Sequence, residues 1–236
     1  MRLAIRNLGT VGYLEARSLQ LDLVEKRRNE SIPDTLLLLE HPPVVTLGRR
    51  AGEADLLADE AAFAREGVEV VRTDRGGQAT YHGPGQLVGY LIFNLYQHGR
   101  RLKRFVHQME EVFIRVLGEI GIEAGRDEEH RGVWVGNKKI TAIGIAVKDS
   151  ITYHGFAFNL DPTLRHFDLI VPCGITDRGQ TSVAELLKAE GIPYPGPEVF
   201  YKRVVRVLAE VFGYEEITGS TEVSDYGEIT GEVSSG

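Results

Sequence analysis

Apolar and polar residues alternate along the chain with two different periods, which take turns from one end of the sequence to the other. Alternation with a period of two, or a short unbroken apolar run, predicts a strand, whereas apolar residues three or four positions apart predict a helix. Strands are predicted at residues 2–8, 35–40, 44–47, 68–72, 87–95, 132–135, 139–147 and 151–159. Helices are predicted at residues 12–28, 55–65, 102–120, 182–189 and 197–212. This order predicts a single α/β domain built on a mixed, largely antiparallel sheet that is flanked by helices.

Charge is distributed unevenly along this pattern. The 236 residues include 27 basic and 34 acidic side chains, but no Lys or Arg follows Arg206. Seven of the acidic residues do follow it, so residues 1–206 carry as many acidic as basic side chains. Residues 215–236 are rich in Ser, Thr, Gly and Glu and contain little that could be buried. We therefore expect a folded domain at residues 1–214 and a flexible acidic tail at residues 215–236.

Composition removes several classes of protein. The single cysteine, Cys173, excludes an internal disulfide. Glu15 interrupts the region in which a signal peptide needs an unbroken apolar stretch, and the apolar run at residues 36–39 is far too short to cross a bilayer. The seven histidines are scattered, with no pair at helical spacing that would start a zinc site. We therefore expect a cytoplasmic protein without a metal centre.

Residues 75–86 form the first of three segments that do not fit ordinary secondary structure. Four glycines and one proline in twelve residues predict a loop whose backbone can approach a ligand closely. Arg75, Thr80, Tyr81, His82 and Gln86 crowd the same loop. The spacing matches neither of the glycine patterns that bind nucleotide phosphates, so a nucleotide site is not supported.

Residues 136–145 form the second segment. Gly136-Asn137 predicts a hairpin turn between two strands. Strict alternation on the second strand would place Lys139, Thr141, Ile143 and Ile145 on one face, and Ile140, Ala142 and Gly144 on the other. The position of Lys139 fits either a solvated lysine beside a turn or a lysine with a chemical role.

Residues 170–175 form the third segment, in which Pro172 and Gly174 flank Cys173. A cysteine in such a chain is usually a small buried apolar residue, but a tight turn of this kind would present the thiol and free backbone N–H groups. A nucleophilic cysteine acts as its thiolate, and the reference pKa of about 8.5 means that a nearby cation would help. The candidate cations are Lys139, His82, His154 and His166.

These segments together resemble the lipoyl(octanoyl) transferases of protein lipoylation. The resemblance rests on RGGQATYHGPGQLVGY, KKITAIGI, HGFAFNL and IVPCGITDRGQTSVAEL, and it runs from His41 to Leu186. It implies a fold shared with biotin- and lipoate-protein ligases and with the core of class II aminoacyl-tRNA synthetases. It also implies transfer of an octanoyl group from acyl carrier protein to a lysine ε-amine, with Cys173 as the nucleophile that forms an acyl-thioester and Lys139 as its acid/base partner.

The resemblance further implies an acyl pocket, protein partners and no cofactor, since the acyl group arrives on the phosphopantetheine of acyl carrier protein. The expected pocket residues are Arg75, Gly76, Gly77, Gln78, Ala79, Thr80, Tyr81, His82, Ala142, Ile143, Gly144, Gly155, Phe156 and Ala157. The small residues among them would leave a narrow apolar slot suited to eight carbons. The expected partners are acyl carrier protein and the lipoyl domains of 2-oxoacid dehydrogenase complexes and of the glycine cleavage H protein, with no nucleic acid and no membrane. We expect at least one of the basic clusters, Arg49-Arg50 or Arg100-Arg101 with Lys103 and Arg104, to contact acyl carrier protein.

Four alternatives stay open on the sequence alone. An ATP-dependent lipoate-protein ligase of the same fold is disfavoured by Cys173 and by the lack of a nucleotide loop. An amidotransferase that moves octanoyl between lipoyl-bearing proteins is closer. A thioesterase would differ in using water as the acceptor, and a non-catalytic module that binds carrier proteins would need neither Lys139 nor Cys173.

Overall fold

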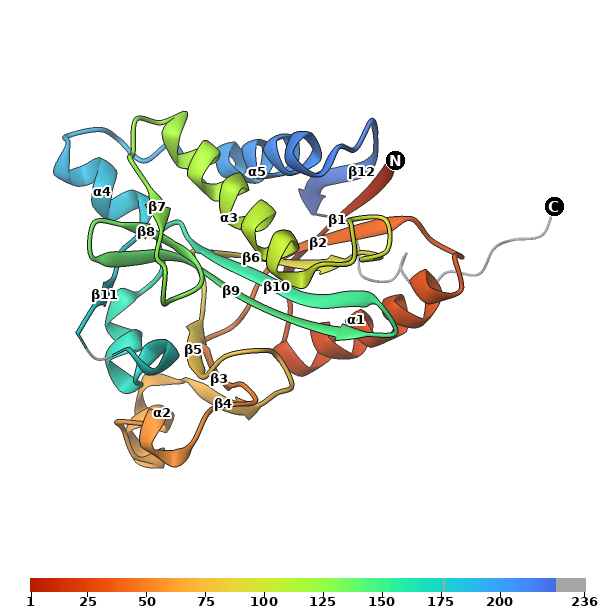
Figure 1. Cartoon of the computed structure of the whole chain (residues 1–236). Helices are drawn as coiled ribbons and strands as arrows, with labels where there is room; N and C mark the ends of the chain where they lie inside the picture. The colour runs from red at the N-terminus through yellow and green to blue at the C-terminus, as the bar shows by residue number, and fades with distance from the viewer. Residues whose placement is uncertain (176, 224–236) are drawn as a thin grey trace.

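A mixed sheet of nine strands runs through the centre of the molecule (Figure 1). The computed structural model describes residues 1–175 and 177–223, except for the side chains of Cys173 and Val223. In order across the sheet, eight of its strands are β12 (Glu216–Val223), β1 (Arg2–Thr10), β2 (Asp34–Glu40), β6 (Gln86–Ile92), β10 (Ile151–Asn159), β9 (Lys138–Lys148), β8 (Val133–Val135) and β7 (Gly125–Arg126), and the ninth, β11 (Gly179–Gln180), pairs with β9. β12, β1 and β2 run parallel, as do β11 and β9, and the other neighbouring pairs of these strands are antiparallel. The prediction of a mixed, largely antiparallel sheet is confirmed.

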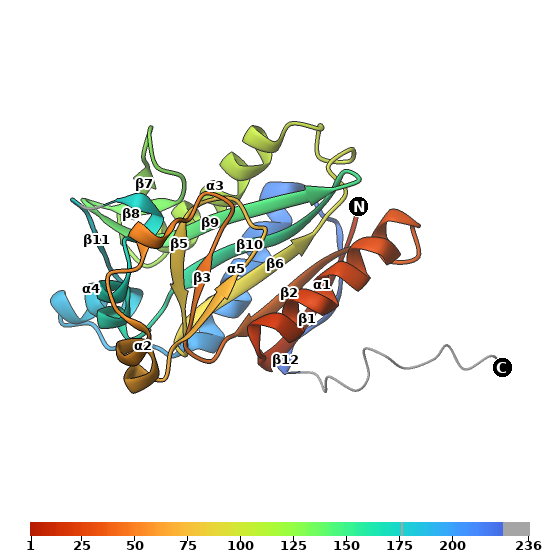
Figure 2. The same cartoon turned by 90° about the horizontal axis from the view of Figure 1, so that it is seen from below.

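Helices and a second, smaller sheet cover the two faces of the large sheet. α3 (Leu102–Gly118) and α5 (Pro197–Phe212) pack their apolar stripes against one face. α1 (Tyr13–Arg28) covers the other face beside a sheet of β4 (Glu69–Arg72), β3 (Val44–Leu47) and β5 (Ala79–His82), as Figure 2 shows. The remaining elements are α2 (Glu60–Glu66), α4 (Val183–Ala189) and the short 3₁₀ turns η1 (Glu53–Asp55), η2 (Leu164–Leu169) and η3 (Pro172–Gly174). No helix in the described part of the chain has the length and apolar character needed to cross a bilayer.

Most predicted elements lie within a few residues of the observed ones, and two differ for clear physical reasons. The helix predicted at residues 55–65 begins only after Asp59, because that carboxylate accepts a hydrogen bond from the Ala62 N–H at 2.8 Å and caps α2 there. The residues before Asp59 include η1 instead. The predicted loop at residues 75–86 contains β5, which pairs antiparallel with β3 across the small sheet. Its flanking glycines concealed a strand of four residues.

A bulge in β9 corrects the expected alternation of its side chains. Trp134 of β8 pairs with Lys139, whereas the preceding residue of β8 pairs with Thr141, so one extra residue lies between the two pairs on β9. Ile140 is fully buried in the cluster that also includes Ile143, although strict alternation assigns them to opposite faces. Ala142, which strict alternation places on the same face as Ile140, packs instead against the cluster on the α1 side of the sheet. The predicted face of Ile140 is therefore wrong.

The C-terminal prediction is wrong for residues 216–223, which form β12 rather than a flexible tail. β12 pairs parallel with β1, and the Asn7 side-chain amide donates to the Thr221 carbonyl at 2.6 Å. The Met1 ammonium also donates to the Glu215 carboxylate at 3.1 Å. An edge strand gains backbone hydrogen bonds without burying apolar side chains, so composition gave no sign of it. The rest of the predicted tail, residues 224–236, lies outside the described residues.

Candidate active site

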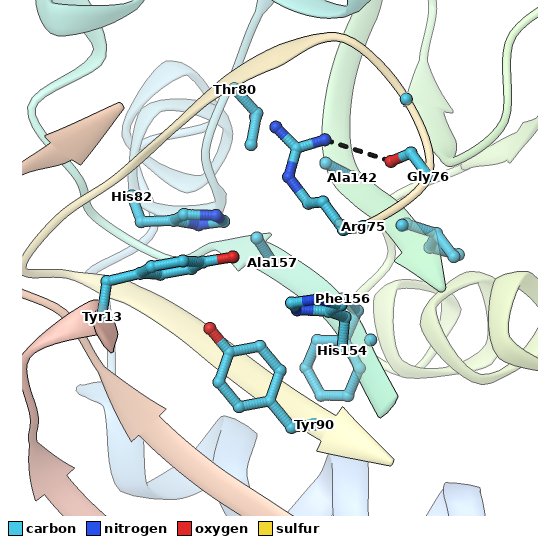
Figure 3. Close-up of a pocket in the computed structure, with 14 residues that line it drawn as sticks. Tyr13, Arg75, Gly76, Thr80, His82, Tyr90, Ala142, His154, Phe156 and Ala157 are labelled. Carbon is cyan, nitrogen blue, oxygen red and sulfur yellow. Dashed lines mark hydrogen bonds between the residues drawn. The ribbon is translucent and has the colours of Figure 1, made fainter. Parts of the chain in front are cut away.

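Arg75 fixes the glycine-rich loop against the small sheet. Its buried guanidinium donates to the Thr46 carbonyl and the Gln78 carbonyl, each at 2.6 Å, and to the Gly76 carbonyl at 3.1 Å (Figure 3). Gly77 then turns with φ of +100°, a backbone conformation that side chains rarely allow. The predicted pocket residue Arg75 therefore shapes the loop with its own side chain, and the loop backbone forms one wall of a slot.

The opposite wall of this slot comes from small residues of two paired strands. Gly144 of β9 lies directly opposite Gly155 of β10, and Ala142 lies opposite Ala157. The slot encloses about 470 Å³, its open mouth included. The predicted pocket residues that line it are Arg75, Gly76, Gly77, Thr80, His82, Ala142, Ile143, Gly144, Gly155, Phe156 and Ala157. The structure thus brings together residues from three separate motifs around one narrow, largely apolar space.

Three predicted pocket residues face elsewhere. Successive side chains of a strand point to opposite faces, so Ala79 and Tyr81 of β5 lie in the core behind the slot, away from Thr80. The Tyr81 hydroxyl is 2.9 Å from Nδ1 of His166. Gln78 lines a neighbouring cleft. Their assignment to the slot is wrong, because the loop prediction took no account of a strand at this position.

Tyr13, Tyr90 and His154 also line the slot; the sequence named His154 only as a candidate cation and gave no role to the two tyrosines. Figure 3 shows their side chains reaching the same space as His82. The Tyr13 ring stacks on the His82 ring with 6.2 Å between centroids and 10° between planes. Tyr90 ends the first motif and His154 begins the third, so both were visible in the motifs; Tyr13 at the start of α1 carried no signal.

His41 and His82, near these tyrosines, are held as neutral imidazoles. Nδ1 of His41 donates to the Val11 carbonyl at 2.6 Å, which leaves Nε2 to accept from the Tyr90 hydroxyl, also at 2.6 Å. Burial lowers the pKa of His41 to about 4. Burial also lowers the pKa of His82, whose Nδ1 donates to the Gln86 side-chain carbonyl at 2.7 Å. His82 is therefore a poor candidate for a cation that activates a thiol.

His154 is neutral and conformationally strained. Its φ is +58°, which is unusual for a residue with a side chain, and its backbone N–H donates to the Gln20 side chain at 2.7 Å. Nε2 donates to the Asp74 carboxylate at 3.1 Å, while Nδ1 has no partner among the described residues. Burial lowers the pKa of His154, and the hydrogen bond from His154 is the main cause that lowers the pKa of Asp74. His154 therefore ties the interior of β10 to Gln20 and Asp74 and supplies no positive charge.

Lys139 is only 2% exposed, so the interpretation as a solvated lysine is wrong. Its ammonium lies 4.8 Å from the centre of the Trp134 ring, and it makes no hydrogen bond or ion pair with the described residues. The side chain lines a cleft that also includes Gln78 and that shares Gly76, Gly77, Ile143 and Gly144 with the slot. A buried amine beside the slot is thus left without a carboxylate partner.

The turn that carries Cys173 adjoins this cleft. Its backbone forms η3, in which the Gly174 N–H donates to the Val171 carbonyl at 3.2 Å, and the Cys173 side chain lies outside the described residues. Gly174 has φ of +71°, and a Cβ there would collide with the side-chain amide of Gln78. Gln78 therefore touches the cysteine turn and lines the same cleft as Lys139. Contact between Lys139 and Cys173 stays a prediction.

His166 is the remaining candidate cation, and the possible metal ligands can be examined in the same way. Both ring nitrogens of His166 lie within hydrogen-bond distance of other groups, at 2.9 Å from the Tyr81 hydroxyl and 3.2 Å from the Glu66 carboxylate. Across residues 1–175 and 177–223, no three His, Cys, Asp or Glu side chains gather in a way that could hold a metal ion. Of the candidate cations, Lys139 is the one that lines the cleft beside the cysteine turn.

Known proteins are similar to this chain in sequence and in fold. The lipoyl protein ligase A/B catalytic domain matches residues 12–213. An octanoyltransferase of Desulforamulus reducens is 45% identical over 91% of this chain and 93% of its own. The chain belongs to the octanoyltransferase family. Members of that family are acyltransferases, so the chain is an enzyme, and the resemblance of its motifs is confirmed.

Solved structures extend the likeness at the level of the fold. Lipoate-protein ligase A bound with ATP superposes with a TM-score of 0.69 at 15% identity, covering 96% of this chain and 90% of the ligase. Biotin protein ligase from Aquifex aeolicus in complex with biotin and ATP superposes with a TM-score of 0.55 at 14% identity, covering 90% and 70%. The expected fold of biotin- and lipoate-protein ligases is confirmed. At these identities the likeness concerns the fold alone, so membership of the octanoyltransferase family favours transfer over ligation.

Proposed function

We propose that this member of the octanoyltransferase family moves an octanoyl group from the thioester of acyl carrier protein to the ε-amine of a lysine in lipoyl domains. Cys173 carries the acyl group between the two, and Lys139 moves the protons. The observation that carries this proposal is the amine of Lys139, which is buried with no carboxylate partner among the described residues. It lines a cleft that joins the acyl slot and adjoins the cysteine turn. A structural lysine at this depth would normally be paired with an acid.

The slot supports an acyl chain of medium length as the cargo. The wall of the slot that consists of glycine and alanine on β9 and β10 offers backbone and methyl groups to an alkyl chain. Each methylene that leaves water for such a slot contributes about 0.8 kcal/mol, so a slot of fixed depth distinguishes chains by length. The residues that surround it come from rigid strands and from a loop that Arg75 holds in place.

The first half-reaction charges the enzyme. Lys139 takes the proton from the Cys173 thiol, and the thiolate attacks the thioester carbonyl of the donor. The tetrahedral intermediate collapses as the bond to the pantetheine sulfur breaks, and Lys139 returns the proton to that sulfur. A thioester is already activated, so no ATP and no cofactor are needed. The acyl group is now a thioester of Cys173.

The second half-reaction moves the acyl group from Cys173 to the acceptor lysine. The acceptor lysine, as a free amine, attacks the acyl-Cys173 carbonyl, and the bond to the cysteine sulfur breaks. Lys139 accepts the proton that the amine loses and passes it to the Cys173 thiolate, which restores the starting enzyme. The acceptors would be lipoyl domains of 2-oxoacid dehydrogenase complexes and of the glycine cleavage H protein. We place the enzyme with these partners in the cytoplasm.

Intact-mass spectrometry tests the proposal. The protein is incubated with octanoyl-acyl carrier protein and no ATP, with and without a lipoyl domain. We expect an octanoyl adduct that maps to Cys173 and disappears as the lipoyl domain gains the octanoyl group. Octanoylation of the domain without any adduct, even in rapidly quenched samples, would contradict the covalent step. A requirement for ATP and free octanoate would favour a ligase, and loss of the adduct to water alone would favour a thioesterase.

Two neighbouring lysines give a matched pair of variants for the role of Lys139. Lys139→Met removes the buried amine, whereas Lys138→Met removes an exposed one that pairs with the Glu185 carboxylate at 3.2 Å. Loss of a general acid/base typically costs about 10²–10⁴-fold in rate. We expect a loss of that size for Lys139→Met in both half-reactions and near wild-type rates for Lys138→Met. Equal rates for the two variants would contradict the assignment.

A further inference from the structure

The cleft into which Lys139 projects gathers basic side chains from three distant parts of the chain, and we refer to it as the basic cleft. Arg49 and Arg50 come from the turn after β3, and Arg131 comes from the loop between β7 and β8. Lys139 of β9 forms part of the floor, beside the Gly76–Gln78 wall. The backbone N–H groups of Arg49 and Arg50 donate to the carbonyls of Arg75 and Gly77, each at 3.1 Å, so the turn is fixed relative to the slot.

The described residues neutralise little of the positive charge of the basic cleft. Arg49, Arg50, Arg131 and Lys139 make no ion pair or hydrogen bond through their side chains with the described residues. Among the residues that the structure describes, Glu129 is the one carboxylate that lines the cleft. Three guanidinium groups that converge on a concave surface with one described carboxylate create a local field that attracts an anion.

Three acidic residues close to this region in the sequence are engaged elsewhere, whereas Glu128 and Glu129 make no side-chain ion pair with the described residues. Asp127 pairs with Arg178, and Glu110 and Glu111 pair with Arg126 at 3.3 and 2.7 Å. Arg126 and Arg178 are therefore paired with carboxylates, whereas Arg49, Arg50 and Arg131 have no ion pair within the described part of the chain. Arginine presents a planar set of donors that matches a phosphate group.

The position of the basic cleft beside the slot narrows the choice of anion. The two share Gly76, Gly77, Ile143 and Gly144, so one extended molecule can occupy both. Such a molecule would carry an apolar chain at one end and a phosphate at the other. An acyl group on a phosphopantetheine arm has this form.

We infer that the basic cleft binds the phosphate of the donor's phosphopantetheine arm, chiefly through Arg50 and Arg131, while the acyl chain occupies the slot. This inference rests on the proposed function, because it concerns the donor of the same transfer. The other basic cluster is a weaker candidate for this role. The Arg100 guanidinium stacks on the Tyr96 ring at 4.2 Å. Lys103 lines a neighbouring cleft that holds four carboxylates and shares only Glu129 and Arg131 with the basic cleft among the described residues.

Calorimetric binding of 4′-phosphopantetheine and of pantetheine tests the inference without any turnover. The wild-type protein is expected to bind the phosphorylated arm at least tenfold more tightly than the unphosphorylated one. Arg50→Ala and Arg131→Ala should each reduce this ratio severalfold, whereas Lys202→Ala, on the exposed side of α5, should leave it unchanged. Equal affinity for both ligands in the wild type, or an equal ratio in all variants, would overturn the inference.

Transfer from octanoyl-4′-phosphopantetheine and from octanoyl-pantetheine separates failure of this inference from failure of the proposed function. The readout is the ratio of the two kcat/KM values, in which any general loss of folded enzyme cancels. We expect the double variant Arg50→Ala/Arg131→Ala to lower the ratio at least tenfold. A ratio near one in an active wild-type enzyme would overturn the phosphate site and leave the transferase in place. No transfer from either donor, together with preferential binding of 4′-phosphopantetheine, would contradict the proposed reaction and leave the phosphate site in place.

Octanoyl-coenzyme A distinguishes the two sources of such an arm. Its phosphate belongs to a pyrophosphate that continues into a nucleotide, whereas the carrier protein holds the arm through a single phosphodiester. The inference expects octanoyl-acyl carrier protein to show the higher kcat/KM, and Arg131→Ala to lower that value more than Arg131→Lys does. Preference for octanoyl-coenzyme A would contradict the carrier protein as the source.

Discussion

Single hydrogen bonds around the slot fix which of its groups can carry charge. The Tyr90 hydroxyl satisfies Nε2 of His41, and Nδ1 of the same ring donates to a backbone carbonyl. His154 likewise donates the single N–H of its neutral ring to the Asp74 carboxylate. Because these rings beside the slot are neutral, the amine of Lys139 is left as the proton carrier of the proposed mechanism.

The Tyr90–His41 bond makes a prediction about stability. Tyr90→Phe removes the hydroxyl and leaves the acceptor nitrogen of a fully buried histidine without a partner. An unsatisfied buried polar atom costs about 1–3 kcal/mol, so the free energy of unfolding should fall by that amount in urea titrations. Tyr96→Phe is the control, because the Tyr96 side chain is 55% exposed and its hydroxyl stays hydrated. Equal, small effects of the two substitutions would contradict the buried bond.

The alanines of the slot make a prediction about chain length. Ala142→Val adds two carbons opposite Ala157 and shortens the space available to an acyl chain. At about 0.8 kcal/mol per methylene, the ratio of kcat/KM for octanoyl over butyryl donors should fall about tenfold. Val147→Leu, at a more exposed position of the same strand, should leave that ratio unchanged. A constant ratio in Ala142→Val would place the acyl chain elsewhere.

A slot residue could be predicted from the sequence when it belonged to a recognisable motif and when its strand was also predicted. Gly144 and Gly155 were predicted from separate motifs and face each other across β9 and β10. Tyr81 was misplaced because adjacent residues of β5 point to opposite faces, and the strand itself was read as loop. Tyr13 was missed because a tyrosine at a helix start is an ordinary core residue until the fold brings a slot to it.

At the scale of whole elements, burial separates what the sequence could predict from what it could not. α3 and α5 each bury a continuous apolar stripe, and the helical spacing of those apolar residues in the sequence predicted both helices. β12 buries little and is held by backbone hydrogen bonds to β1, which leave no periodic trace. The bulge in β9 could not be predicted from the sequence either, because it depends on the register with β8 and not on any residue type.

Gly219 provides a test of β12 as an element. It has φ of +86°, and a Cβ there would collide with the backbone carbonyl of Ile5 on β1. Gly219→Ala should therefore lower the free energy of unfolding by about 1–3 kcal/mol in urea titrations, through strain and loss of pairing. The exposed neighbour Thr218 gives the control Thr218→Ala, which should cost less than about 0.5 kcal/mol. No difference between the two variants would mean that β12 does not pair in solution.

At the scale of the whole molecule, the site exists because the large sheet gathers segments that are far apart in the chain. The glycine-rich loop, β9 and the cysteine turn meet at one end of the sheet, although about a hundred residues separate the first from the last. Each segment could be recognised from its own residues. Their distances could not, because these depend on the crossovers that place β9 and β10 between β6 and β8.

The same gathering buries three neutral imidazoles, and this gives the whole molecule a predictable dependence on pH. Burial lowers the pKa of His41 to about 4, against about 6.5 in the unfolded chain, and it also lowers the pKa values of His82 and His154. The unfolded state therefore binds more protons below pH 6.5, so stability is complete above that pH and is lost as the pH falls towards 4. His41 alone should lower the free energy of unfolding by about 2 kcal/mol between pH 7.5 and pH 5.

Urea titrations of matched variants at these two pH values would identify the source of that loss. His41→Gln keeps a donor and an acceptor at the buried position but cannot take up a proton, so about 2 kcal/mol of the pH dependence should disappear. His107→Gln removes an imidazole on the exposed side of α3, where folding changes its surroundings little, and should keep the wild-type dependence. A wild-type stability that is equal at both pH values, or an equal loss in both variants, would show that His41 is not held neutral by the fold.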